Sequence, residues 1–367
     1  MISVGLSLNF ENAHRYTDRE VYEQTLAIAD LAEELGFDVV SVTEHHFNGA
    51  FSLSPDPITE LAYIAGRTSR IDLLTAAVIL PWNDPVRVAE RISLLDNLAS
   101  GRVIFGMGRG LSCREFEGFG VPMSESRQRF DEAAPMIMRA LSTGWIEGDG
   151  PFYPQKRVEI HPVPTRPFSE RIYSIGAGSP ESVVTAARLG AGLMLTIQRQ
   201  LIDHDESIQL YRDRFRDVHG REASLPLIVG FPMYCHPNGD VARARAREWT
   251  SNYYDHIVRH YDYDRPDTFK GKRGYEAYAQ IADQLSTESG LDAAKESYFS
   301  SGVYGSPEEI ITEVTRIHEA IGDFTWLCAG GVPYPEHAES VRLFAREVLP
   351  ELKKLRPRRP QVRSSLR

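Results

Sequence analysis

The chain has 367 residues, 42% of them hydrophobic and 10% aromatic, which suffices for one large domain or two of average size. The formal net charge of −10 argues against nucleic acid as a partner, and the three cysteines (Cys113, Cys235 and Cys328) fit neither a disulfide framework nor a metal-binding motif. The N-terminus lacks a signal-peptide pattern, and no run approaches the ~20 apolar residues that span a membrane. We therefore expect a cytoplasmic protein with no membrane partner.

Short apolar runs alternate with helical patterns along the chain, which is typical of successive βα units in a parallel sheet. Eight runs have the length and flanking residues of buried strands: Ser3–Leu8, Val39–Val42, Leu73–Ile79, Val103–Met107, Arg171–Ile175, Gly192–Thr196, Leu227–Tyr234 and Thr325–Ala329. Eight parallel strands are the number that closes a barrel. Since no Gly/Ser-rich linker divides the chain, the pattern predicts a single α/β domain over residues 1–355, a (β/α)8 barrel rather than two doubly wound halves.

Three of the intervening helices have clear start signals. Thr17 and Glu20 form a capping box before an apolar helical face, which Gly36 ends. Pro85 stands at a first-turn position before the third helix. The run Ser306–Glu309 combines an N-cap, a first-turn proline and a second capping box before the last long apolar stripe.

Two segments depart from this regular pattern. The extended segment 252–301, between strands seven and eight, is rich in tyrosine and should lie over the mouth of a barrel. It is either a lid over a substrate or a set of extra helices that pack their own aromatic side chains. Residues 356–367 are basic, aperiodic and interrupted by proline, which indicates a disordered tail.

A glycine-rich turn follows the fourth predicted strand. In Gly106-Met-Gly108-Arg109-Gly110-Leu111, glycines let the backbone approach a ligand and the arginine offers a fork that matches phosphate oxygens. A dinucleotide-binding G-x-G-x-x-G turn would need glycine at the position of Leu111. The turn therefore indicates a phosphate-bearing cofactor, with a simple strand-ending turn as the alternative.

A second candidate anion site follows the fifth strand. Ser179 is a natural N-cap, Pro180 suits the first helical turn, and such a helix start attracts anions. Glu181 counts against this interpretation because its carboxylate would repel a phosphate, and capping alone would explain the serine. Together with Arg109 and Arg127, however, this turn predicts one phosphomonoester held by two arginines and two hydroxyls.

Adjacent histidines follow the second strand, in Glu44-His45-His46. Neighbouring strand residues point to opposite faces, so this spacing disfavours a shared metal ion and we expect none. One imidazole should face the mouth, where it can accept or donate a proton near neutral pH. A hydrogen-bonded structural histidine is the alternative.

Several motifs occur in a fixed order along the chain: Glu44–Phe47, Leu74–Pro81, Pro85–Glu90, Leu94–Arg102 and Phe105–Leu111. Together they resemble the bacterial luciferase family of flavin-dependent monooxygenases. The resemblance extends from the N-terminus to about Thr196 and resumes from Gly302 to Leu352. It implies a TIM barrel that binds reduced FMN (FMNH2), whose reaction with O2 forms a flavin hydroperoxide that transfers one oxygen atom to a small organic substrate.

The resemblance also assigns residues. The family's phosphate-binding side chains correspond to Arg109, Arg127, Ser179 and Ser182. Backbone contacts nearby correspond to Leu111 and Gly178.

At the flavin ring, the family has a non-proline cis peptide bond that corresponds to Ala76-Ala77. Its catalytic histidine corresponds to His45, and Glu44 is the neighbour at the flavin. The luciferase itself has a reactive cysteine in place of Gly108 and an aromatic residue in place of Ser112, so light emission is not expected here.

The resemblance implies the oxygenase half of a two-component system, served by a separate NAD(P)H:flavin reductase and assembled as a homodimer through helices near strands two and three. A deazaflavin-dependent oxidoreductase on the same fold is the first alternative. A non-catalytic flavin-binding subunit is the second, and a metal-dependent hydrolase the third.

Overall fold

Eight parallel strands form a closed barrel in the computed structural model, which describes residues 2–13, 16–176, 179–196, 200–272, 275–329 and 331–358. The strands are β1 Ser3–Leu8, β2 Val39–Val42, β3 Asp72–Thr75, β5 Val103–Gly108, β8 Ile172–Gly176, β9 Gly192–Thr196, β10 Leu227–Cys235 and β12 Phe324–Ala329. Each pairs with the next in this series, and β12 closes the ring on β1. The predicted single (β/α)8 barrel is confirmed.

Seven of the eight predicted strands agree with the structure to within one residue at each end. The third was predicted as one strand, Leu73–Ile79, but is divided into β3 and β4 (Val78–Ile79), both of which pair with β5. A cis peptide bond joins Ala76 to Ala77 between them, as the family resemblance implied. An unbroken apolar run could not indicate the division, because both halves remain buried.

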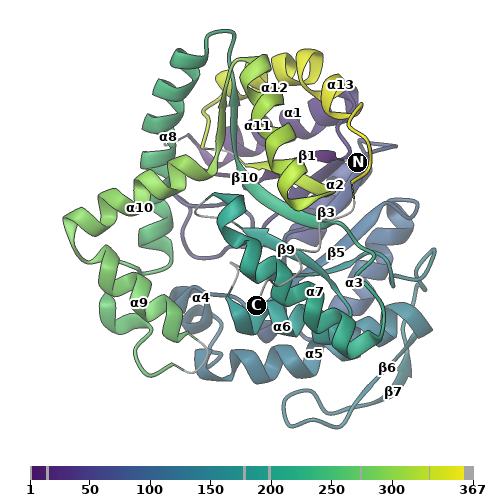
Figure 1. The fold of residues 1–367 in the computed structure, drawn as a ribbon. Helices are drawn as coiled ribbons and strands as arrows, with labels where there is room; N and C mark the ends of the chain where they lie inside the picture. Colours follow the sequence, from purple (N-terminus) through teal and green to yellow (C-terminus); the bar gives the residue numbers. More distant parts are fainter. Residues whose placement is uncertain are drawn as a thin grey trace.

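Helices cover the outside of the barrel (Figure 1): α1 Asp18–Leu35, α2 Pro57–Ala65, α3 Pro85–Leu98, α5 Ser126–Thr143, α6 Pro180–Leu189, α7 Asp205–His219, α11 Pro307–Ile321, α12 Glu336–Glu347 and α13 Leu349–Leu352. The predicted capping boxes are confirmed at Thr17 for α1 and Ser306 for α11. Pro85 occupies the first turn of α3, and Gly36 ends α1 with a φ of +84°, a conformation that suits glycine.

Shorter elements complete the chain. A helix, α4 Cys113–Gly118, follows β5, and a two-stranded hairpin of β6 Trp145–Gly148 and β7 Gln155–Glu159 precedes β8. Strand β11 Val303–Gly305 adds to the sheet beside β10. The described residues also include the 3-10 turns η1 Leu80–Trp82, η2 Met123–Glu125, η3 Leu201–His204 and η4 Pro266–Thr268.

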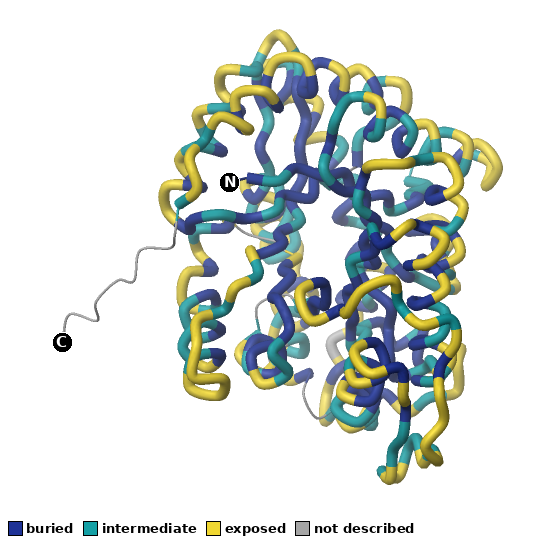
Figure 2. Tube along the Cα trace, turned by 90° about the vertical axis from the view of Figure 1, so that its right-hand side faces the viewer, coloured by how far each residue is buried: buried dark blue, intermediate teal, exposed yellow. Residues whose placement is uncertain are grey.

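The main core lies between the barrel wall and the surrounding helices, where buried segments concentrate toward the middle of the molecule (Figure 2). A smaller cluster fills the barrel interior: Val39, Leu74, Tyr173, Met194, Ile228 and Leu327. Two of these, Met194 and Leu327, also line the pocket described below. The filled interior therefore forms the floor of that pocket.

The segment 252–301 lies between β10 and β12, as predicted, although its first residues belong to a longer helix, α8 Gly239–His260. It continues through α9 Glu276–Leu285 and α10 Glu288–Ser301, at the left of Figure 1. Its buried side chains form one cluster with Phe51, Phe116 and Met123 from the barrel loops. The segment therefore packs its aromatics as extra helices would and also covers the mouth; movement as a lid stays a prediction.

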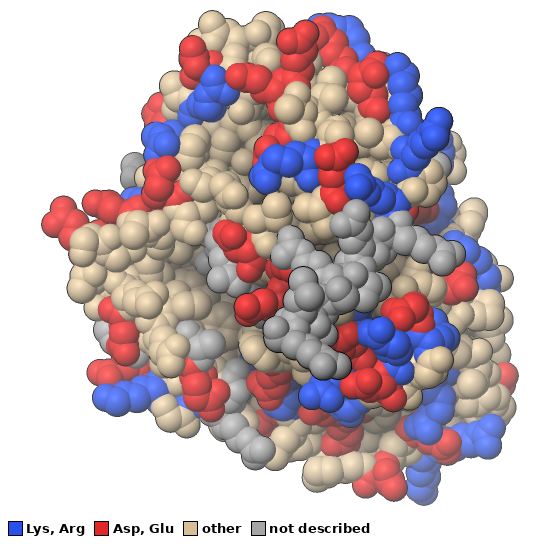
Figure 3. Space-filling model, in the orientation of Figure 1, with Lys and Arg blue, Asp and Glu red and all other residues tan. Residues whose placement is uncertain are grey.

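The described part of the C-terminus ends against the barrel, where the backbone of Arg358 exchanges hydrogen bonds with Asp323. Residues 359–367 lie outside the described residues. None of the helices that the structure describes is long and apolar enough to span a membrane. On the face in Figure 3, acidic and basic side chains are interspersed rather than separated by sign.

Candidate active site

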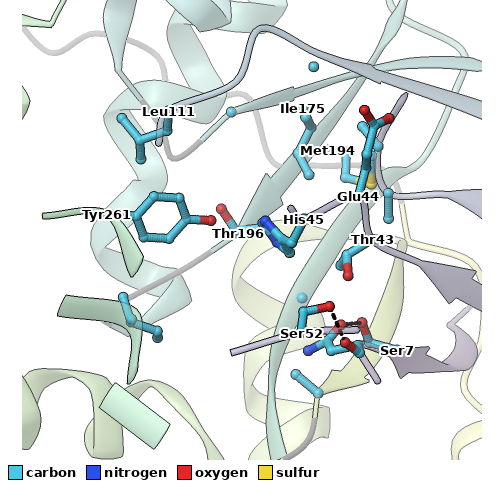
Figure 4. A pocket seen from close by; sticks show the side chains of 18 of the residues that line it. Ser7, Thr43, Glu44, His45, Ser52, Leu111, Ile175, Met194, Thr196 and Tyr261 are labelled. Carbon is cyan, nitrogen blue, oxygen red and sulfur yellow. Dashed lines mark hydrogen bonds between the residues drawn. The ribbon is translucent and has the colours of Figure 1, made fainter. Parts of the chain in front are cut away.

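A pocket opens at the carboxyl ends of the strands, where residues from all eight barrel strands or their following loops meet the inserted helices. Figure 4 shows His45 and Tyr261 projecting into it, with Ser7 and Ser52 on one side and Ile175 and Met194 on another. In parallel barrels the mouth at the carboxyl ends of the strands is where ligands bind. The pocket is therefore the candidate active site.

Arg109 lies at one end of the pocket, directly after β5. The strand leads into this turn with close backbone packing, because a Cβ atom at Gly106 would lie 2.1 Å from the carbonyl oxygen of Thr75. The guanidinium carbon of Arg109 lies 4.1 Å from the centroid of the Tyr275 ring. Tyr275 also donates a hydrogen bond to the carbonyl oxygen of Gly110 (3.0 Å), so the insertion is attached to this turn.

Arg127 lies in the first turn of α5 and approaches the same end of the pocket. Its Nη1 donates to Oγ1 of Thr185 at 3.1 Å, and its Nε lies 3.1 Å from Oε1 of Glu181. Burial, and then the positive charge of Arg109, lower the pKa of Arg127. The two guanidinium groups are therefore close enough to repel each other, an arrangement that a shared anion would stabilise.

Ser179 and Ser182 provide the hydroxyl groups of this end. Ser179 is the N-cap of α6, where its Oγ accepts from the backbone N–H of Ser182 at 3.4 Å and donates to Oγ of Ser182 at 3.0 Å. Ser179 and Ser182 thus lie at the start of α6, the helix whose Glu181 and Thr185 contact Arg127. The carboxylate of Glu181, which counted against phosphate binding in the sequence, does face Arg127. Gly178 lies outside the described residues.

Glu44 organises another part of the pocket wall. Its buried carboxylate accepts hydrogen bonds from the backbone N–H of Ile79 at 3.0 Å and from Nε1 of Trp82 at 2.7 Å. It thereby ties the end of β2 to the turn that follows the Ala76-Ala77 peptide bond. Ala76, Ala77 and Leu111 all line the pocket, so the residues assigned to flavin contacts surround one cavity.

The two adjacent histidines make different contacts, although both lie in the loop after β2 and not in a strand, so strand alternation does not explain the difference. His45 lines the pocket, whereas Nε2 of His46 lies 3.3 Å from Oε1 of Glu44. Nδ1 of His45 lies 3.4 Å from Oε1 of Glu115, which leaves Nε2 for the cavity. His45 is therefore the histidine that can exchange a proton with a bound ligand.

Two residues near His45 were missed by the sequence interpretation, namely Glu115 on α4 and His260 at the end of α8. Neither belongs to a motif, and they stand 70 and 215 positions after His45 in the chain. Their type alone gave no signal, because acidic residues and histidines are frequent on helix surfaces. Only the folded chain brings them together.

The remaining wall is mostly aromatic, with a small polar group at its base. Tyr253, Tyr261 and Tyr298 from the insertion face Ser7 and Asn9 at the end of β1. Asn9 donates a hydrogen bond to Glu11 at 3.0 Å, and the backbone N–H of Gly331 donates to the same carboxyl group at 2.9 Å. Burial outweighs these bonds and raises the pKa of Glu11 to about 7.

A family model described as luciferase-like monooxygenase matches residues 2–323. The alpha chain of alkanal monooxygenase from Photorhabdus laumondii is 26% identical over 346 residues, which cover 92% of this chain and 94% of that protein. Monooxygenase RslO1 from Streptomyces bottropensis has a TM-score of 0.76 at 27% identity, over 95% of this chain and 99% of that one.

The oxygenating constituent of 3,6-diketocamphane monooxygenase from Pseudomonas putida, a type II Baeyer–Villiger monooxygenase in complex with FMN, has a TM-score of 0.75. The comparison covers 98% of this chain and 100% of that one, at 17% identity. At that identity the likeness shows the shared fold alone.

Proposed function

The chain belongs to the luciferase-like monooxygenase family, and we propose that it is the oxygenase component of a two-component system that uses reduced FMN and O2. The substrate is a small organic molecule that gains one oxygen atom. The observation that carries this proposal is the convergence of Arg109, Arg127, Ser179 and Ser182 on one end of the barrel mouth. A single phosphate ester fits this end, since the turn after β5 has Leu111 where a dinucleotide-binding turn would need glycine.

The residues fit the phosphate of FMN in a specific way. Nη2 of Arg127 is buried and has no hydrogen-bond partner among the described residues, so its N–H groups can donate to a bound anion. The serine hydroxyls and the start of α6 add further donors. Charge-assisted hydrogen bonds contribute roughly 1.5–3 kcal/mol each, so the phosphate can supply much of the ~8 kcal/mol of micromolar binding.

The cavity beyond the phosphate end suits a flat, apolar ring system. Its walls include Ala76, Ala77, Ile79, Ile175 and Met194. When bound there, reduced FMN supplies the electrons that activate O2. The protein shapes the site around it. Glu44 fixes the pocket wall at Ile79 and Trp82, and the tyrosines of the insertion exclude water from the reacting groups.

His45 is the residue that we assign to proton transfer. Its Nδ1 faces the buried carboxylate of Glu115, which orients the ring and stabilises it when it is protonated. Nε2 then exchanges the proton with the ligand in the cavity. This role follows the general logic of a histidine held by a carboxylate and needs no metal ion.

The partners of this reaction are part of the proposal. A separate NAD(P)H:flavin reductase would deliver reduced FMN, and the protein would act in the cytoplasm. We further propose a homodimer through α2 and α3, which expose Tyr63, Leu94 and Leu98 at 55%, 47% and 58% of their surface. Light scattering of the purified protein tests the dimer.

Oxygen uptake tests the function. Purified protein, FMN, NADH and a flavin reductase are combined with a panel of aldehydes, ketones and aromatic compounds. We expect substrate-dependent oxygen uptake with an oxygenated product. Uptake that yields only hydrogen peroxide with every compound would contradict the proposal, and tighter binding of a deazaflavin than of FMN would favour the deazaflavin-dependent alternative.

A further inference from the structure

His260 is a completely buried histidine at the mouth of the barrel, on the last turn of α8. Its ring stacks on Phe51 with 4.2 Å between centroids and meets the ring of His45 edge-on at 5.0 Å. Nε2 faces Oε1 of Glu115 at 3.3 Å, whereas Nδ1 has no hydrogen-bond partner among the described residues. Burying such a group is unfavourable, so its presence beside the proposed proton-transfer residue calls for a reason.

Glu115 lies between the two imidazoles. Its Oε1 accepts a hydrogen bond from the backbone N–H of His46 at 2.8 Å, which fixes the carboxylate in place. The same oxygen lies 3.4 Å from Nδ1 of His45 and 3.3 Å from Nε2 of His260. One carboxylate oxygen therefore faces two histidines that come from different elements, the loop after β2 and the end of α8.

The electrostatics assign different roles to the three groups. Burial alone would raise the pKa of Glu115, but the contacts with His260 and His45 lower it to about 2, so the carboxylate is ionised. Burial lowers the pKa of His260 to about 4, against the opposing effect of Glu115. His260 is therefore neutral near pH 7.

Other charged groups near this cluster largely compensate one another. Arg114 on α4, which lowers the pKa of His260, lies 3.8 Å from Asp262. Glu44 is paired with His46 through a 3.3 Å contact. The buried phenol of Tyr261 has a raised pKa and stays neutral.

We propose that His260 is a positioning residue that acts through Glu115 to control when His45 takes up a proton. This inference rests on the proposed role of His45. The neutral His260 ring offers an N–H to Glu115 and shares the negative charge of the carboxylate. Without that ring the carboxylate would act on His45 alone. When Nε2 of His45 accepts a proton, Nδ1–H stays directed at Glu115, and both Glu115 and His260 keep their protonation states.

The proposal predicts opposite effects for two substitutions. In His260→Phe the ring stack with Phe51 is kept but the donor is lost, so Glu115 attracts the proton on His45 more strongly. The acid limb of the kcat–pH profile then moves to higher pH. In Glu115→Gln the carboxylate charge is lost, and the acid limb moves to lower pH by about one unit, the size expected for loss of one nearby opposite charge. KM changes little in His260→Phe.

His260→Gln keeps an N–H donor and should restore the wild-type profile. If His260→Phe fails to fold, His260→Met removes the donor with a flexible side chain and is judged by the same criterion. His318→Gln is the matched control, because His318 is buried on α11 with Nε2 2.8 Å from Asp323, on the far side of the barrel from the cavity. It should lower stability and leave the acid limb unchanged.

A second readout separates this inference from the proposed function. The imidazole signals of His45 are followed by NMR against pH in the purified protein without added flavin. Opposite displacements of the His45 titration in His260→Phe and Glu115→Gln support the inference even if no substrate is oxygenated. A titration in His260→Phe that coincides with wild type overturns it.

A metal ion is the competing explanation, since His45, Glu115 and His260 present donor atoms that all lie within 4.8 Å of one another. Elemental analysis of the purified protein decides between the two. One equivalent of zinc or another transition metal that is lost in His260→Phe would overturn the inference.

Discussion

The two ends of the pocket are built in different ways. At the proposed phosphate end, two of the groups come with a local motif: Arg109 lies in a glycine-rich turn and Ser179 caps a helix. At the His45 end, the groups come from separate parts of the chain, with Glu115 on α4 and His260 on the insertion. The residues that we propose for phosphate binding thus lie in or near local motifs, whereas those that we propose for proton transfer depend on how this chain folds its insertion.

The largest effect is expected at the His45 end. His45→Ala removes the proton-transfer group, and coupled oxygenation should fall by roughly 10²–10⁴-fold while FMN binding changes little. Product formation and flavin binding are measured on the same preparation. His161→Ala, at an exposed histidine beside Glu159, serves as the control and should behave as wild type. Equal losses of binding and turnover in His45→Ala would instead mean that His45 mainly shapes the pocket.

At the phosphate end, Arg127→Ala should weaken FMN binding by roughly 10–100-fold, since one charge-assisted pair contributes ~1.5–3 kcal/mol. Turnover at saturating FMN should be nearly unchanged. Fluorescence titration gives the Kd. Arg188→Ala is the matched control, because Arg188 is an exposed arginine of α6 that pairs with Asp131 instead. Unaltered binding in Arg127→Ala would mean that the phosphate lies elsewhere.

The pH dependence of stability tests the polar base of the pocket. Burial raises the pKa of Glu11 from its ordinary 4.5 to about 7, so the folded protein keeps this proton longer than the unfolded chain does. The contribution of Glu11 to the free energy of unfolding is therefore greatest below pH 4.5. It falls by roughly 3 kcal/mol in total as the pH rises through 7.

Glu11→Gln removes this dependence. Denaturant unfolding at pH 5, 6, 7 and 8 should show a smaller decline in the free energy of unfolding for the variant than for wild type. Burial also raises the pKa of Glu60 to about 7. Because Glu60 is present in wild type and in Glu11→Gln, its effect cancels when their free energies of unfolding are compared. Parallel curves for the two proteins would mean that Glu11 is ionised in the folded state.

The smallest effect is expected for Ser179→Ala at the start of α6. Loss of the N-cap should reduce stability by about 1 kcal/mol, and loss of one hydroxyl should weaken FMN binding a few-fold. Ser306→Ala removes a comparable cap from α11, away from the pocket. It should lower stability to a similar extent without any change in FMN affinity. If Ser179→Ala and Ser306→Ala bind FMN with equal affinity, Ser179 acts only as the N-cap of α6.

Sequence patterns were sufficient for the barrel, and they indicated Arg109 and Ser179 as candidates for the proposed phosphate end. Hydrophobic runs report which strands are buried, capping residues report where helices start, and Arg109 and Ser179 each sit in a recognisable turn; these are all properties of neighbouring residues. The family resemblance added the Ala76-Ala77 peptide bond and the choice of His45 over His46, which local pattern left open.

The division of the third strand, the longer extent of α8 and the contacts of Glu115 and His260 were decided only by tertiary structure. Each depends on groups far apart in the chain that share one buried environment, and the stability of a buried charge or an unpaired imidazole depends on what surrounds it in space. Local sequence patterns do not indicate which distant side chains will be in contact, because the partner of a side chain is set by packing of the whole fold.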